Sequence, residues 1–168
     1  MDRPITGFEL DAEGAWVALL SCGHRQHVRH EPPFTNRAWV TNEVERDRRL
    51  GAPLPCVPCD RFELPAYFVP YHRTPLFSEA TVPAKLTSEH RTKVGVWARI
   101  VVTEGRLRYH VQRLGRTVEV GKDEVAVVVS EDPHLVEPLG AVQFYVEFFR
   151  APGKQARLSS PLRGGPGE

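Results

Sequence analysis

SCGHRQHVRHEPP, residues 21–33, and CVPCD, residues 56–60, decide how the first third of this chain can fold. Together they hold all three cysteines of the 168-residue chain, and the first stretch also holds three of its seven histidines. A tetrahedral zinc site takes four Cys or His ligands, commonly offered as two close pairs. Cys56 and Cys59 form one pair with C-x-x-C spacing. The other pair must combine Cys22 with His24, His27 or His30.

Three cysteines and one histidine complete a Cys3His zinc site, and we favour His24 as the fourth ligand, with His27 as the alternative. Gly23 lets the chain turn sharply between Cys22 and His24. About sixty residues with few large apolar side chains form a marginal core, which a metal ion commonly stabilises. A closed set of four ligands predicts structural rather than catalytic zinc.

The alternative interpretation is that Cys56 and Cys59 are free or redox-active thiols and that the histidines lie on the surface. A redox C-x-x-C normally opens a helix within a βαβ unit. The residues around 56–59 indicate no such context, so the sequence favours zinc.

Composition excludes several classes of protein. The net charge is +1, from 22 basic and 21 acidic residues, which gives no general attraction to nucleic acid or to an anionic membrane. Residues 1–60 hold seven Arg against nine Asp or Glu, which also disfavours a nucleic-acid-binding zinc module. No run approaches the ~20 apolar residues that span a bilayer, and residues 1–10 lack a signal-peptide pattern. We therefore expect a cytoplasmic protein without nucleic-acid or membrane partners.

The distribution of cysteines suggests two units that meet near residues 61–65. In the first unit, residues 5–20 predict a β-hairpin around the turn-forming DAEG at 11–14. Residues 42–50 are the only plausible short helix, ended by Gly51 and Pro53. We expect a zinc-binding module over 1–62, a second domain over 63–152 and a disordered tail over 153–168.

The second unit has the texture of an all-β domain. Turn signals separate its apolar segments, and several short strands at near-regular spacing predict a sandwich or small barrel. The strand-like segments are 94–102, 106–112, 117–120, 124–130 and 141–150. The expected fold class is mainly β.

A resemblance supports the first unit. CGHRQHVRHEPP, NRAW at 36–39 and CVPCD resemble a small bacterial family of unknown function, whose motif is CGH-x-QH-x-RH-x-PP followed by R-x-W and C-x-x-C. The likeness covers roughly residues 5–60. It implies a discrete domain with a metal site, and it implies no activity.

A second resemblance covers about residues 64–152. HRTKVGVWARIVVTEGRLRYHV, PH at 133–134, VEFFRAP at 146–152 and YHRTPLF at 71–77 are similar to the tellurite-resistance-protein-like domain of the TehB/YeaR type. That family implies a cupin-like, jelly-roll β-barrel with a polar pocket for a metal ion or a small ligand. By position, the matching polar residues are His90, His134 and Glu147, with His134 placed at a turn between strands.

Two functions follow from these observations. The first is a non-enzymatic protein that binds a small molecule or oxyanion in metalloid or stress response, with Arg91, Lys93 and Arg99 as candidate anion contacts. The second is a metal-dependent cupin-type enzyme in which His90, His134 and Glu147 hold a second divalent metal ion. The barrel segment lacks the H-x-H-and-Glu motif typical of metal-binding cupins, so we favour the first. Strand edges also make a homodimer through the barrel plausible.

Overall fold

Strands dominate the computed structural model of the chain, which describes residues 1–28 and 37–153. His30 and the tail predicted to be disordered, apart from Gly153, lie outside the described residues. The strands are β1 (Asp2–Leu10), β2 (Trp16–Leu20), β3 (Arg25–His27), β4 (Pro53–Pro55), β5 (Val69–Arg73), β6 (Phe77–Ser78), β7 (Trp97–Glu104), β8 (Arg106–Val111), β9 (Arg116–Gly121), β10 (Val125–Val128), β11 (His134–Pro138) and β12 (Gln143–Arg150). The helices are α1 (Glu43–Asp47), α2 (Val57–Asp60) and α3 (Ala84–Thr87), with 3-10 turns η1 (Ala38–Thr41) and η2 (Gln112–Leu114).

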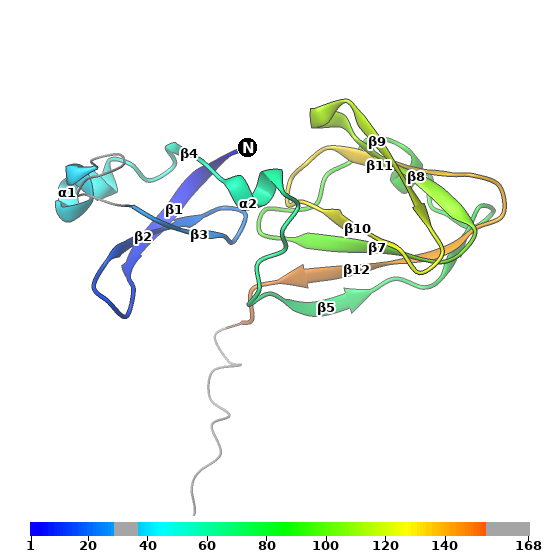
Figure 1. Ribbon diagram of the computed structural model, residues 1–168, viewed down its shortest axis with the longest axis horizontal. Coiled ribbons are helices and arrows are strands. Elements are labelled where there is room, and N and C mark those ends of the chain that lie inside the picture. Colours follow the sequence, from blue (N-terminus) through cyan, green and yellow to red (C-terminus); the bar gives the residue numbers. More distant parts are fainter. Residues whose placement is uncertain (29–36, 154–168) are drawn as a thin grey trace, which may run out of the picture.

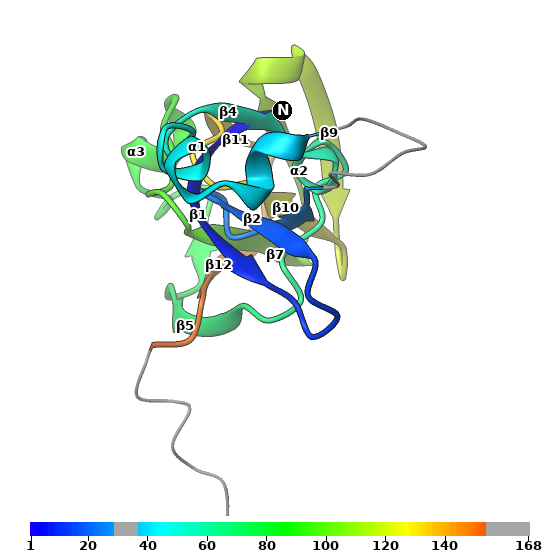
Figure 2. The ribbon, with the colours of Figure 1, turned by 90° about the vertical axis from the view of Figure 1, so that its left-hand side faces the viewer.

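The N-terminal sheet is antiparallel, with strand order β3-β2-β1-β4. The expected hairpin over residues 5–20 is confirmed as β1 and β2. Its turn forms because the Asp11 carboxylate accepts hydrogen bonds from the backbone N–H groups of Glu13 and Ala15, at 2.9 and 2.8 Å. The sheet lies at the end of the molecule that faces the viewer in Figure 2.

The C-terminal part, which we call the barrel, is built from two antiparallel sheets. One sheet has strand order β10-β7-β12-β5, with β6 also paired to β12, and the other has the order β11-β8-β9. Alternate residues of both sheets bury their side chains in one core, which includes Ile100 and Phe144 from the first sheet and Leu107 and Val136 from the second. The mainly β fold class is confirmed.

Two sequence-based assignments are wrong at the ends of strands. The strand predicted over residues 94–102 is β7, which begins at Trp97 and not at Val94, because a turn closed by the Val96 N–H and the Lys93 carbonyl precedes it. His134 does not lie in a turn but is the first residue of β11, where it is paired with Val111 of β8.

The expected helix over residues 42–50 is present as the shorter α1. The Asn42 side chain caps it by accepting a hydrogen bond from the Glu45 N–H at 3.1 Å. The expectation that this would be the only helix of the first unit is wrong, because α2 also forms, and the second unit, expected to be all-β, contains α3. Each is four residues long, which is too short for helical periodicity to reveal.

One hydrophobic core crosses the predicted boundary near residue 62. It joins Ile5, Leu20 and Val40 to Trp97 and Phe149 of the barrel. In Figure 1, α2 lies between the N-terminal sheet and the barrel strands. The two parts are therefore packed together rather than merely tethered. None of the helices among the described residues has the length and hydropathy to cross a membrane.

Candidate functional site

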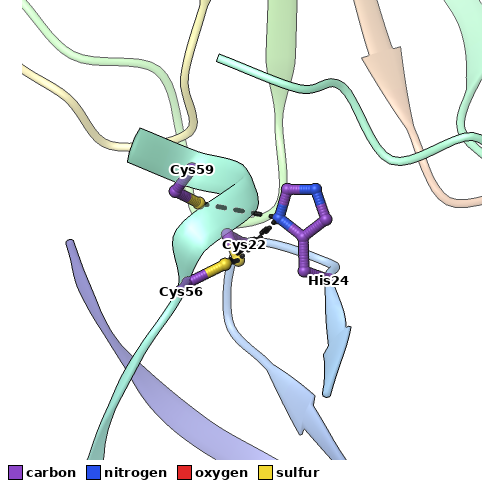
Figure 3. A group of neighbouring side chains, drawn as sticks. All are labelled: Cys22, His24, Cys56 and Cys59. Carbon is purple, nitrogen blue, oxygen red and sulfur yellow. Dashed lines mark hydrogen bonds between the residues drawn. The ribbon is translucent and has the colours of Figure 1, made fainter. Parts of the chain in front are cut away.

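Four residues predicted as metal ligands lie together where the N-terminal sheet meets the barrel (Figure 3). Cys22 and His24 lie in the connection between β2 and β3, and Cys56 and Cys59 lie at the start and within α2. The three cysteines are fully buried and form no disulfide, while His24 is half-buried. The four candidate ligand atoms all lie within 4.8 Å of one another.

His24 Nδ1 faces all three sulfur atoms. It lies 3.5 Å from Cys22 Sγ, 3.4 Å from Cys56 Sγ and 3.6 Å from Cys59 Sγ. Cys22 Sγ and Cys56 Sγ are 3.9 Å apart. Thiolate sulfur and imidazole nitrogen are the donors that soft and borderline transition metals prefer, so the group could hold one metal ion.

Local backbone structure brings the two pairs together. The Gly23 N–H donates to the Leu20 carbonyl at 2.8 Å, and the Leu20 N–H donates to the His24 carbonyl at 3.0 Å, which closes a tight loop. Gly23 has a φ of 92°, a conformation that glycine adopts without steric cost. The single turn of α2 places Cys56 and Cys59 on the side of the helix that faces His24.

The electrostatics of the group suit a bound cation. Burial opposes protonation of His24, but its hydrogen bonds with Cys22 and Cys56 raise its pKa to about 9. Hydrogen bonds with Cys22 and Cys59 hold the pKa of Cys56 far below its usual range. The same crowding by Cys22 and Cys56 raises the pKa of Cys59. Three thiols in this space cannot all ionise unless a positive charge lies among them.

The C-x-x-C pair does open a helix, contrary to expectation, since Cys56 is the N-cap residue of α2. The βαβ context of a redox motif is nevertheless missing, because α2 follows the short strand β4 of an antiparallel sheet. Both sulfurs also lie against a third cysteine and a histidine.

The alternative ligand His27 points elsewhere. Its Nε2 lies 2.8 Å from Asp11 Oδ2, and its side chain is largely exposed. His27 is not part of the four-residue group.

A second candidate site is a pocket of about 370 Å³ in the barrel. Its walls are mainly apolar and are formed by Leu86, Ile100, Val128, Val136, Val146 and Phe148. Its polar lining includes His90 and His134 and the exposed cationic residues Lys85, Arg91 and Lys93. Among the described residues that line it there is no Asp or Glu.

The structure brings His90 and His134 together. Their backbones exchange two N–H···O hydrogen bonds of 3.0 Å each, and their ring centroids lie 4.2 Å apart. His134 is 3% exposed. Desolvation lowers its pKa to about 4, so its ring is uncharged at neutral pH.

Glu147 and Arg99 do not join this pair. They are opposite each other in the register of β12 and β7. Val146 and Phe148, on either side of Glu147, line the pocket, so Glu147 and Arg99 belong to the other face of the sheet. Arg99 is exposed, with its guanidinium 4.9 Å from the Phe149 ring centroid.

Sequence reasoning missed the residues that join the four-residue group to the barrel. Trp97 is fully buried, and its Nε1–H donates to the Cys22 carbonyl at 2.7 Å. Arg3, also buried, donates from Nη2 to the Ser130 carbonyl at 2.5 Å. Arg113 contacts both Asp60, next to Cys59, and the buried Asp132. A tryptophan in an apolar strand was the one available signal, since a buried indole N–H needs an acceptor.

Both resemblances noted in the sequence are confirmed by family comparisons. Residues 6–63 match the family described as "Protein of unknown function (DUF3565)", and residues 72–146 match the TehB-like domain. No curated protein matches the chain.

Solved structures with likeness to the chain were also found. A protein from E. coli (strain K12) is 25% identical, with a TM-score of 0.49 over 53% of this chain and 96% of that one. TehB from Haemophilus influenzae is 21% identical, with a TM-score of 0.48 over 51% of this chain. The match spans only 32% of the length of that TehB chain. A Cupin_2 domain of an XRE family transcriptional regulator from Enterobacter cloacae is 14% identical, with a TM-score of 0.34 over 52% of this chain and 100% of that one.

Proposed function

This chain matches the DUF3565 family in its N-terminal part and the TehB-like domain in its C-terminal part, and we propose that it is a binding protein. In this proposal a structural zinc ion stabilises one end of the barrel, and the barrel holds a small anionic molecule. The observation that carries this proposal is the barrel pocket, where three cationic residues and no acidic one accompany apolar walls.

Zinc is the metal that best fits the four-residue group. In tetrahedral zinc sites with Zn–S near 2.3 Å and Zn–N near 2.0 Å, the donor atoms lie roughly 3.5–3.8 Å apart. The Nδ1–Sγ distances of 3.4–3.6 Å and the Sγ–Sγ distance of 3.9 Å agree with that spacing. Burial of the three cysteines supports a closed, structural role.

The pocket favours an anion with an apolar body. Guanidinium and ammonium groups can neutralise a carboxylate or another oxyanion through charge-assisted hydrogen bonds. Arg91 and Lys93 follow His90 directly along one segment, so cationic and imidazole groups border the same space. Walls of Ile, Leu, Val and Phe then favour a hydrocarbon or aromatic body.

A metal-dependent enzyme is the second candidate, and the proximity of His90 to His134 supports it. Against it, Glu147 lies on the other face of the sheet, and the cations that line the pocket disfavour a second metal ion. A role in metalloid response would require that an inorganic oxyanion bind in the same pocket.

Metal content tests the zinc site. We expect elemental analysis to find near-stoichiometric zinc in the wild-type protein and in His27→Ala, and little in Cys56→Ser. His27→Ala is the matched control because it removes a nearby histidine outside the group. Zinc lost equally from both variants, or missing from the wild type, would contradict the proposal.

Ligand titration tests the pocket. By calorimetry we expect phenylacetate, an oxyanion with an apolar body, to bind more tightly than selenite, a bare oxyanion. Arg91→Gln/Lys93→Gln should weaken phenylacetate binding about tenfold for each cationic group removed. Arg116→Gln/Lys122→Gln, a control with the same charge change on exposed residues outside this pocket, should leave it unchanged. Tighter binding of selenite would instead favour metalloid response, and equal weakening by both double variants would exclude the pocket.

A further inference from the structure

The two pocket histidines are held in the same tautomer. His90 Nδ1 lies 2.9 Å from the Ser88 carbonyl oxygen, and His134 Nδ1 lies 2.7 Å from the Asp132 carbonyl oxygen. A carbonyl oxygen only accepts, so each Nδ1 carries the proton that it donates. A neutral ring in this tautomer presents the lone pair of Nε2 as a hydrogen-bond acceptor. Among the described residues, neither Nε2 has a hydrogen-bond partner.

The surrounding structure fixes both rings in place. The paired backbone hydrogen bonds between His90 and His134 direct the two side chains to the same side. The acceptor for His134 belongs to Asp132, whose buried carboxylate receives Arg113 Nε at 3.3 Å on both oxygens. Glu131, the preceding residue, has a φ of 61°, a conformation that costs energy for a non-glycine residue and is held by its surroundings. Preorganised groups of this kind are typical of binding sites.

The pocket therefore offers two kinds of group to a ligand. Arg91, Lys93 and Lys85 supply positive charge and hydrogen-bond donors, whereas the neutral His134 ring supplies only an acceptor on this side. A bare carboxylate satisfies the first kind and leaves the acceptors without a donor. An ammonium group would satisfy the acceptors but would meet the cationic residues that line the same pocket.

We propose that the ligand of this pocket is a hydroxy acid, whose carboxylate contacts Arg91 and Lys93 and whose neighbouring hydroxyl donates a hydrogen bond to Nε2 of His134 or His90. This inference rests on the proposed function, and it adds the hydroxyl group as the feature that would distinguish the ligand from other acids. A site built to pair with a hydroxyl discriminates strongly against an analogue without one, because its polar groups are then left unpaired.

Mandelate and phenylacetate form a matched pair of probes, since they differ by one hydroxyl next to the carboxylate. With the zinc-loaded full chain, we expect calorimetry to show at least tenfold tighter binding of mandelate. His90→Phe and His134→Phe each keep a ring but remove one acceptor, and at least one of the two variants should bind mandelate and phenylacetate equally well. His110→Phe, which replaces a histidine paired with Glu137 outside the pocket, should keep the preference.

If His134→Phe does not fold, a spectroscopic measurement on the wild-type protein still decides the question. Long-range proton–nitrogen spectra of histidine-labelled protein should show an unprotonated Nε2 on His134 that shifts with mandelate and less with phenylacetate. A protonated Nε2 in the free protein would overturn the inference.

The possible failures are distinct. Equal binding of the two acids would overturn the hydroxy-acid inference and leave the proposed function standing, whereas binding of neither acid would overturn both. Stoichiometric binding of nickel or copper by the zinc-loaded protein, lost in His134→Phe, would show that the pair is a metal chelate and would also overturn the inference.

Discussion

At His134, burial and one backbone hydrogen bond determine the chemistry of the side chain. The ring is almost inaccessible, and desolvation, the largest influence, lowers its pKa from the usual 6.5 to about 4. The hydrogen bond to Asp132 fixes the tautomer. The residue is thus a neutral acceptor over the whole physiological range of pH.

This pKa predicts a dependence of stability on pH. Between pH 6.5 and 4 the unfolded chain binds a proton at His134 that the folded chain does not, so the free energy of unfolding falls as the pH falls. From pH 7 to pH 5 the loss should be about 2 kcal/mol. Urea unfolding of wild type and His134→Phe over this range measures it, because acid loss of zinc affects both proteins and cancels in the difference. Parallel pH profiles would show that His134 is not the source.

At the scale of elements, the β2–β3 connection holds Cys22 and His24, half of the four-residue cluster, and its conformation depends on Gly23. Its φ is positive, and a Cβ at this position would overlap the Phe68 ring. Gly14, in the β1–β2 turn, has a similar φ of 81° but open space around it. Replacing Gly14 by alanine therefore measures the cost in stability of the backbone conformation alone, whereas replacing Gly23 adds the cost of overlap with Phe68.

Gly14→Ala should cost roughly 1–2 kcal/mol, from backbone conformation alone. Gly23→Ala should cost about 2–5 kcal/mol, because overpacking is added, and it should also lower zinc retention. Denaturant midpoints and metal content measure both effects. Similar values for the two variants would show that Phe68 moves aside.

Period-two alternation and turn signals predicted the main strands and the hairpin, because these elements are long enough to show their pattern. These sequence patterns did not predict which face of β12 points into the barrel. In QFYVEFFR, apolar residues occupy both faces, so the sequence could not tell which face Glu147 shares. The start of β11 was also hidden, since Pro133 before His134 indicates a turn, and only the pairing with Val111 of β8 makes the segment a strand.

The grouping of Cys22, His24, Cys56 and Cys59 was predicted because residues of these types at this spacing are typical of metal sites. The position of the pocket could not be predicted in this way. It depends on His90 and His134, which are 44 positions apart in the sequence, meeting through a single pair of backbone hydrogen bonds.

At the scale of the whole molecule, one hydrophobic core contains residues of the N-terminal sheet, the three cysteines of the cluster and residues of the barrel. Trp97 joins the barrel to Cys22, Arg3 joins β1 to the loop after β10, and Arg113 joins Asp60 to Asp132. Both Ser130 and Asp132 lie in the segment that leads to His134. We therefore expect that a metal ion bound at the cysteine cluster would also stabilise the segment that leads to His134 in the pocket.

Removal of zinc by a chelator should lower the melting temperature of the full chain in one cooperative transition. The reason is that a ligand bound only to the folded state stabilises everything that unfolds with it. Calorimetry with and without chelator tests this, and Cys56→Ser should behave like the chelated wild type. A second transition, unaffected by chelator, would show that the barrel unfolds independently.

The position of Trp97 has an optical consequence. Its indole meets the His24 ring edge-on, with 5.3 Å between the centroids, and the next residue, Ala98, lines the barrel pocket. Of the three tryptophans in the chain, Trp97 alone is fully buried. Its fluorescence emission therefore comes from the point where the two sites meet. We therefore expect the Trp97 component of the emission, seen beside that of Trp16 and Trp39, to respond both to loading of the cysteine cluster and to filling of the cavity, without any added label.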